Sequence, residues 1–82
     1  MTSLAIFRRD DITALQKVVL AVLHARADES GRVAVTNREI AAYAATVGPV
    51  ARRSLAALER AGLLVVERRG QKARPQIVRL HA

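Results

Sequence analysis

The sequence predicts a mainly α-helical domain with a small β-hairpin, an α+β fold in the order helix, short strand, helix, helix, strand, strand. A long stretch after Asp11 has apolar residues at helical spacing, two shorter segments carry helix start and stop signals, and two β-branched runs flank a loop near the C-terminus. At 82 residues the chain has room for a single hydrophobic core. We therefore divide it into an N-terminal arm, residues 1–10, and one domain, residues 11–82.

The first helix is predicted over residues 12–27. Apolar residues recur there at intervals of three and four: Ile12, Leu15, Val19 and Leu23. Asp10 and Asp11 precede the stretch, and negative charge is favourable at the start of a helix. Val18 and Leu20 widen the apolar arc beyond one face, which is typical of a helix buried on two sides. We expect a homodimer that forms through this helix and the N-terminal arm.

A turn, a short strand and a second helix follow. The segment Asp28-Glu29-Ser30-Gly31 interrupts the helical pattern, and Arg32-Val33-Ala34-Val35 alternates as a strand does. Thr36 is followed three residues later by Glu39, which is the capping-box pattern at a helix start. The second helix is therefore predicted from Asn37 to about Ala45.

The third helix is predicted from about Pro49 to Arg60, because proline is tolerated in a first helical turn. Thr46 is its candidate N-cap, and Gly62 ends it. Three apolar residues at helical spacing are expected to face the core: Ala51, Leu55 and Leu58. Residues 63–69 and 76–80 then read as strands joined by a hairpin loop, residues 70–75.

Positive charge is concentrated in the second half of the chain. The net charge is +7; residues 47–82 hold eight Lys or Arg against two Asp or Glu, whereas residues 1–46 hold six against five. Such an asymmetry indicates a polyanionic partner, either nucleic acid or an acidic membrane surface. Nucleic acid is favoured, since the excess lies on the third helix and the hairpin.

Two short helices joined by a tight turn containing Gly48 form a helix-turn-helix unit. In Thr36-Asn37-Arg38-Glu39-Ile40-Ala41 and in Leu55-Ala56-Ala57-Leu58-Glu59-Arg60-Ala61-Gly62-Leu63-Leu64 the sequence resembles the winged helix-turn-helix family, and it is similar to MarR-, GntR- and replication-initiator-type winged helices. The resemblance covers residues 11–80. It implies a sequence-specific binder of double-stranded DNA, usually dimeric. The sequence departs from the family in one place, because Ala51 stands where a buried valine is usual.

In this arrangement the recognition helix, about residues 49–60, enters the major groove, and the wing, residues 68–75, lies on the backbone or in the minor groove. The candidate DNA contacts are Thr36, Asn37, Arg38, Pro49, Val50, Arg52, Arg53, Ala56, Arg60, Arg68, Arg69, Lys72 and Arg74. Arginine pairs with guanine O6 and N7, which makes Arg52 and Arg53 candidates for reading bases. The alternative is that both contact phosphates or form a solvated helix face.

Other classes of function find less support. The chain has no cysteine, which excludes a disulfide scaffold, a thiolate nucleophile and a cysteine-ligated metal site. Its two histidines, His24 and His81, are far apart in sequence, and His24 is expected on a helix surface. No nucleophile, base or metal set can be assembled, so we expect no enzyme, no catalytic or metal-binding residues and no cofactor. The longest apolar run, Val18–Leu23, has six residues, against about 20 for a membrane span.

The expectation is therefore a cytoplasmic, nucleoid-associated protein with double-stranded DNA as its partner and no membrane partner. Its role is most simply that of a small prokaryotic, phage or plasmid transcriptional regulator, a repressor acting as a dimer. A winged-helix protein-interaction module, or a plasmid or phage replication or partition factor, is the alternative. No small-molecule effector is evident, because 82 residues leave little room for a ligand domain.

Overall fold

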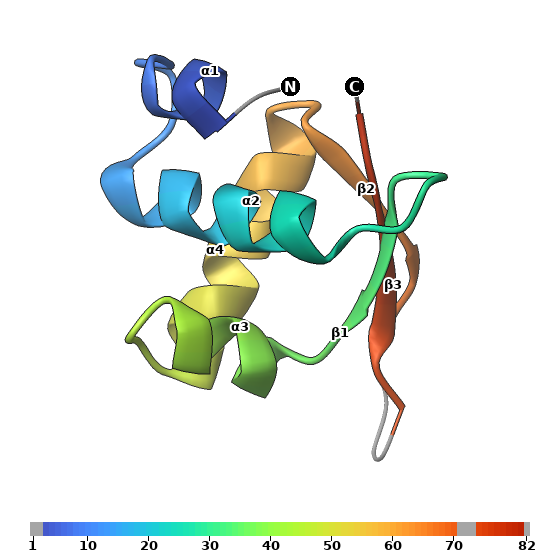
Figure 1. Cartoon of the computed structure of the whole chain (residues 1–82). Coiled ribbons are helices and arrows are strands. Elements are labelled where there is room, and N and C mark those ends of the chain that lie inside the picture. The colour runs from blue at the N-terminus through green and yellow to red at the C-terminus, as the bar shows by residue number, and fades with distance from the viewer. Residues whose placement is uncertain (1–2, 71–73, 82) are drawn as a thin grey trace.

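The computed structural model describes residues 3–70 and 74–81. Along the chain the elements are α1 (Ser3–Phe7), α2 (Ala14–Arg26), β1 (Arg32–Val35), α3 (Asn37–Tyr43), α4 (Gly48–Arg60), β2 (Leu64–Arg68) and β3 (Gln76–Leu80) (Figure 1). This order confirms the α+β fold class. It also adds α1, a helix that the sequence does not predict.

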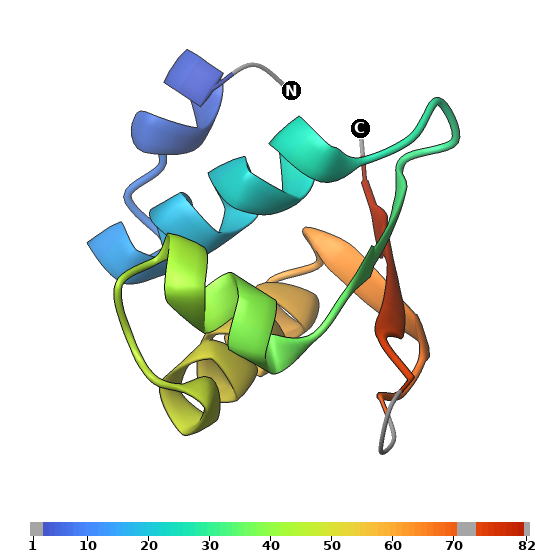
Figure 2. The same ribbon diagram turned by 60° about the horizontal axis from the view of Figure 1, so that its bottom comes forward.

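Helices α1 to α4 lie on one side of the molecule and the sheet lies on the other (Figures 1 and 2). The sheet has the strand order β1-β3-β2, and both pairs are antiparallel. Val78 of β3 lies opposite Val33 of β1 and opposite Val66 of β2, so a row of valines crosses the sheet. The short strand β1, which lies between α2 and α3 in the sequence, therefore joins β2 and β3 in one sheet.

The core fills the space between the helices and the sheet. Val19, Leu20 and Leu23 of α2 are fully buried. Each such side chain contributes about 1.5–3 kcal/mol when it is removed from water. The other buried apolar residues are Ile6, Ile12, Val33, Val35, Ile40, Ala41, Ala51, Leu55, Leu58, Leu63, Leu64, Val78 and Leu80.

The segment predicted as an N-terminal arm contributes to this core. Ile6 of α1 has no exposed surface and belongs to the core cluster. The Lys17 ammonium donates a 3.0 Å hydrogen bond to the carbonyl of Phe7, which ties the end of α1 to α2. The division of the chain after residue 10 stays a prediction, and Ile6 offers a test of it.

Helix α2 begins two residues later than predicted and by a different cap. Thr13 is the N-cap: its Oγ1 accepts a 3.2 Å hydrogen bond from the Gln16 N–H, and the Gln16 Oε1 accepts a 3.0 Å bond from the Thr13 N–H. No acidic residue lies in the first turn. Asp10 and Asp11 lie before the N-cap, and a reciprocal capping box satisfies the first backbone donors.

The turn between α3 and α4 also differs from the prediction. Helix α3 ends at Tyr43 rather than Ala45, and Ala45 has a positive φ of 53°. Gly48 is the first residue of α4, and the N-cap is Val47, whose side chain makes no capping hydrogen bond. The predicted roles of Gly48 as the turn residue and of Thr46 as the cap are therefore wrong. The predicted capping box of Thr36 and Glu39 is confirmed.

The hairpin follows its prediction closely. Helix α4 ends at Arg60, and Gly62, at φ 78°, reverses the chain, with the Leu63 N–H bonded to the Leu58 carbonyl at 3.1 Å. The two strands begin and end within one residue of their predicted bounds, with an irregularity in their pairing between Val66 and Arg68. Residues 71–73 of the predicted loop lie outside the described residues.

Candidate nucleic-acid interface

Helix α4 buries one face and exposes the face predicted to contact DNA. Ala51, Leu55 and Leu58 are buried as expected, and Ser54 joins them. The candidate contacts on the other face are exposed at Pro49, Arg52, Arg53 and Arg60 and half-buried at Val50 and Ala56. The apolar residues of α4 recur at helical spacing and therefore share its buried face. The three arginines of α4 remain exposed to solvent.

The start of α3 holds the next three candidates. Thr36 Oγ1 accepts from the Glu39 N–H, and the Thr36 N–H donates to Glu39 Oε1, each at 3.0 Å. This backbone hydrogen bond and a further one from the Arg26 guanidinium lower the pKa of Glu39, so the cap is held by a charged carboxylate. Asn37 is half-buried, whereas Arg38 is exposed.

The wing supplies the remaining candidates. The Arg68 guanidinium donates a 2.9 Å hydrogen bond to the Pro75 carbonyl, which bridges the two strands near the wing tip. Arg69 donates a 3.4 Å hydrogen bond to Glu59 of α4, and Arg74 is exposed. Lys72 lies outside the described residues.

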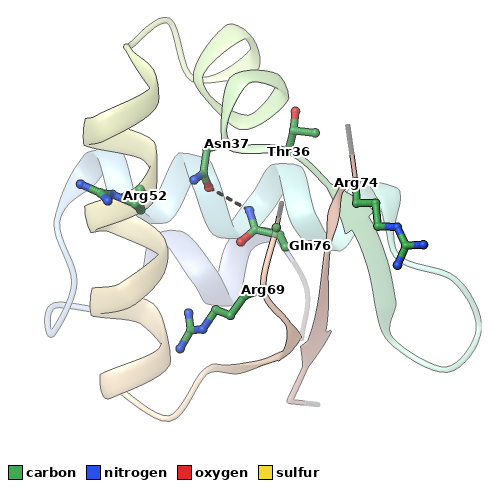
Figure 3. Close-up of a pocket in the computed structure, with 7 residues that line it drawn as sticks. Thr36, Asn37, Arg52, Arg69, Arg74 and Gln76 are labelled. Carbon is green, nitrogen blue, oxygen red and sulfur yellow. Dashed lines mark hydrogen bonds between the residues drawn. The ribbon is translucent and has the colours of Figure 1, made fainter. Parts of the chain in front are cut away.

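A cleft of about 380 Å³ brings residues of all three elements together. Its lining is Thr36, Asn37, Arg52, Arg69, Gly70, Arg74 and Gln76. Asn37 and Gln76 meet at its centre, Arg69 points toward α4, and the guanidinium groups of Arg52 and Arg74 point outward on opposite sides (Figure 3). Cationic groups that spread apart in this way suit an extended polyanion better than one small anion.

Ion pairs neutralise four arginines away from this cleft: Arg9, Arg26, Arg32 and Arg79. Glu67 of β2 accepts a 2.6 Å hydrogen bond from Arg32 of β1 and forms an ion pair with Arg79 of β3 at 3.3 Å; the hydrogen bond from Arg32 lowers the pKa of Glu67 most. Arg26 pairs with Glu39 at 3.0 Å, and Arg9 pairs with Asp11. Within residues 3–70 and 74–81, no ion pair is formed by Arg38, Arg52, Arg53, Arg60, Arg68 or Arg74. Uncompensated positive charge is therefore concentrated on α4, the wing and the start of α3.

Sequence reasoning missed two residues of this region. Gln76 is 6% exposed and bonds to Asn37, and Glu59 bonds to the wing. A signal for Gln76 is present, because it occupies an inward position in the alternation with Val78 and Leu80, where an apolar residue is usual. Nothing in the sequence pairs it with Asn37, which lies 39 residues away.

The two histidines line a second cleft, of about 330 Å³, together with Asp28, Glu29 and Ser30. The separation of His24 and His81 in the sequence therefore does not indicate how far apart they lie in the folded protein. His24, expected on a helix surface, is half-buried, and its Nε2 is buried with no hydrogen-bond partner among the described residues. Among the described residues, no three His, Cys, Asp or Glu side chains form a group that could hold a metal ion.

No protein-family model and no curated protein sequence matches the chain. Solved structures match its fold. The S. aureus MepR–DNA complex is 26% identical with a TM-score of 0.69 and covers 95% of this chain, which spans 60% of that protein. The N-terminal domain of a DNA-binding protein (23% identity, TM-score 0.68) and a Rep–DNA complex (22%, 0.66) each cover 94% of this chain, which spans 69% of either.

These likenesses confirm the winged helix-turn-helix fold. In that fold α3 and α4 are the helix-turn-helix, and β2 and β3 are the two strands that carry the wing. No helix among the described residues is long and apolar enough to cross a membrane.

Proposed function

We propose that this winged helix-turn-helix chain binds double-stranded DNA in a sequence-specific manner. The observation that carries the proposal is the distribution of charge around the first cleft. Arginines of α4 and the wing flank it without ion-pair partners among the described residues, apart from Arg69, whereas the arginines on the outer face of the sheet are paired with Glu67. A surface of this kind binds phosphates through release of their counterions.

We propose that some of the candidate residues contact bases and that others contact the phosphate backbone. Helix α4 is proposed to lie in the major groove, with Arg53 reading a guanine and Arg60 contacting the backbone. Arg52 lines the cleft beside the wing, which favours contact with a phosphate for this residue. The wing, residues 68–75, is proposed to follow the backbone or to enter the minor groove.

The proposed role is that of a small prokaryotic, phage or plasmid transcriptional regulator, a repressor that acts as a dimer in the cytoplasm. The MepR structure, a complex with DNA, supports DNA binding. A dimer through α1 and α2 is supported by Phe7, an aromatic side chain on α1 that is 49% exposed. No catalytic activity, cofactor or small-molecule effector forms part of the proposal.

A role in replication is the second candidate, because a Rep–DNA complex is among the matching structures. A protein-interaction module is the third. Binding sites selected from a random duplex library separate the first two: a repressor site is expected upstream of the protein's own gene, whereas a replication factor binds repeats at an origin.

The direct test is fluorescence anisotropy with a labelled random duplex across a salt series. We expect affinity to fall at least tenfold between about 50 and 200 mM salt, because each neutralised phosphate contributes about −0.9 to the logarithmic slope. The double variant Arg52→Ala/Arg53→Ala should lose most of this binding. Arg32→Ala/Arg79→Ala removes two positive charges that are already paired with Glu67, and serves as the matched control. Absence of binding at low salt would contradict the proposal.

Dimerisation has its own test. Sedimentation velocity of the protein, with and without a selected duplex, is expected to show two chains per complex. Phe7→Asp should shift the free protein toward the monomer. A monomer under both conditions would rule out the dimer but leave DNA binding standing.

A further inference from the structure

We infer that the hydrogen bond between Asn37 and Gln76 holds the wing in the orientation in which Arg74 reaches DNA. The two amides are positioning residues for the wing in this inference, which rests on the proposed function. Gln76 Nε2 donates to Asn37 Oδ1 at 2.8 Å, and the pair lies at the centre of the cleft between α4 and the wing (Figure 3).

The bond joins two elements that are remote in sequence. Asn37 is the first residue of α3, and Gln76 is the first residue of β3. A buried amide is costly unless it is hydrogen-bonded, so Gln76 fits its inward position only when a partner such as Asn37 is within reach. The contact therefore reinforces the backbone pairing of Gln76 with Val35 in placing the start of β3 relative to the helix-turn-helix.

The other strand of the wing is tied to the helix-turn-helix as well. Glu59 of α4 accepts a 2.9 Å hydrogen bond from the Val66 N–H through Oε2, and a 3.4 Å bond from Arg69 through Oε1. Strand β2 is thus attached to α4, while strand β3 is attached to α3. These side-chain contacts add to the pairing of β3 with β1 and to the core packing of both strands in setting the angle between the wing and the recognition helix.

Arg74 is the wing residue that depends on the contact between Asn37 and Gln76. It precedes Gln76 by two residues, lines the same cleft and has no ion-pair partner among the described residues. Its guanidinium points away from the amide pair (Figure 3). A wing that is already oriented in the free protein avoids the entropic cost of ordering it on binding. Without the amide contact, Arg74 should lose much of its contribution to affinity.

The test is a double-mutant cycle measured by anisotropy on one selected duplex. Arg74→Ala is expected to weaken binding about 5- to 20-fold in the wild-type background, as loss of a charged phosphate contact does, and less than about threefold in the Gln76→Met background. Methionine keeps the length of the side chain and removes its donor. Arg53→Ala, on α4, provides the matched cycle: its effect should be the same in both backgrounds.

Circular dichroism and thermal unfolding establish that each variant is folded. If Gln76→Met does not fold, Asn37→Ala removes the same hydrogen bond from the partly exposed side and takes its place in both cycles. An equal loss on Arg74→Ala in both backgrounds, or a change in the Arg53 cycle of similar size, overturns the inference while the proposed function stands. If the wild-type protein binds no duplex, the proposed function fails first.

Discussion

The backbone N–H of Thr46 donates a 2.9 Å hydrogen bond to the carbonyl of Ala41 across the turn between α3 and α4. The residue between them in the turn, Ala45, is left-handed, at φ 53°. This is the hydrogen-bond pattern of a helix C-terminus that usually has glycine at the left-handed position. The direction in which the recognition helix leaves the turn therefore depends on a conformation that the Cβ of Ala45 disfavours, by roughly 1 kcal/mol.

Ala45→Gly is expected to stabilise the protein. Glycine removes the steric cost of the left-handed conformation, and its greater freedom in the unfolded chain offsets part of the gain, so the free energy of unfolding should rise by up to about 1 kcal/mol. Urea denaturation measures it. Ala42→Gly, at an exposed position inside α3, is the control, and should lower stability by about 0.5–1 kcal/mol. A decrease in both variants would show that the turn is not strained.

Ile6→Ala tests whether α1 belongs to the domain. Ile6 is fully buried, so truncation should lower the free energy of unfolding by about 2–5 kcal/mol. Phe7→Ala, one residue later and half-exposed, should cost much less in the monomer. Denaturant unfolding at low protein concentration gives both values. If Ile6→Ala has no effect, residues 1–10 are an independent arm as the sequence suggests.

Arg53→Ala is expected to weaken binding to the selected duplex by about 1–3 kcal/mol and to relax the preference at one base pair. Binding to random duplex should change less, because the lost contact is to a base edge. Competition with duplexes substituted one base pair at a time measures both effects. A uniform loss over all sequences would assign Arg53 to the phosphate backbone instead.

His24 is expected to make stability depend on pH. Burial lowers the pKa of His24 in the folded protein, whereas in the unfolded chain the pKa is about 6.5. The unfolded state therefore binds the proton more readily, so the contribution of His24 to stability is complete above about pH 6.5 and declines as pH falls toward the folded-state pKa.

Thermal unfolding between about pH 7.5 and pH 5 measures this dependence. His24→Gln, which does not titrate in this range, should flatten the profile. The acidic residues with lowered pKa values, Glu39 and Glu67 among them, lose their contributions only at lower pH. A profile unchanged by His24→Gln would assign the dependence to other groups.

The elements with regular patterns could be predicted from the sequence. The spacing of Ala51, Leu55 and Leu58 identifies the buried face of α4, and the capping box of Thr36 identifies the start of α3. The β-branched run and the following alternation locate β2 and β3 to within one residue. Each of these signals is local, because it depends on hydrogen bonds and side chains a few residues apart.

Features without a local signal were missed or wrongly placed. Helix α1 has five residues, too few to show a periodicity, and it forms where Ile6 is buried by the rest of the core. Ala45 has no sequence mark of a left-handed residue, whereas Gly48 has one and lies in a helix. The helical pattern around His24 indicates on which face of α2 this residue lies, but not which other residues cover that face.

The sequence by itself determined the order of the elements from α2 onward, the inward face of α4 and the excess of positive charge after residue 46. These follow from the periodicity of side chains along one segment and from composition. Only the tertiary structure decided which arginines remain unpaired, that β1 pairs with β3, and that Asn37 meets Gln76 39 residues away. Such contacts depend on how separate segments pack, because no local interaction favours one distant partner over another until the core has formed.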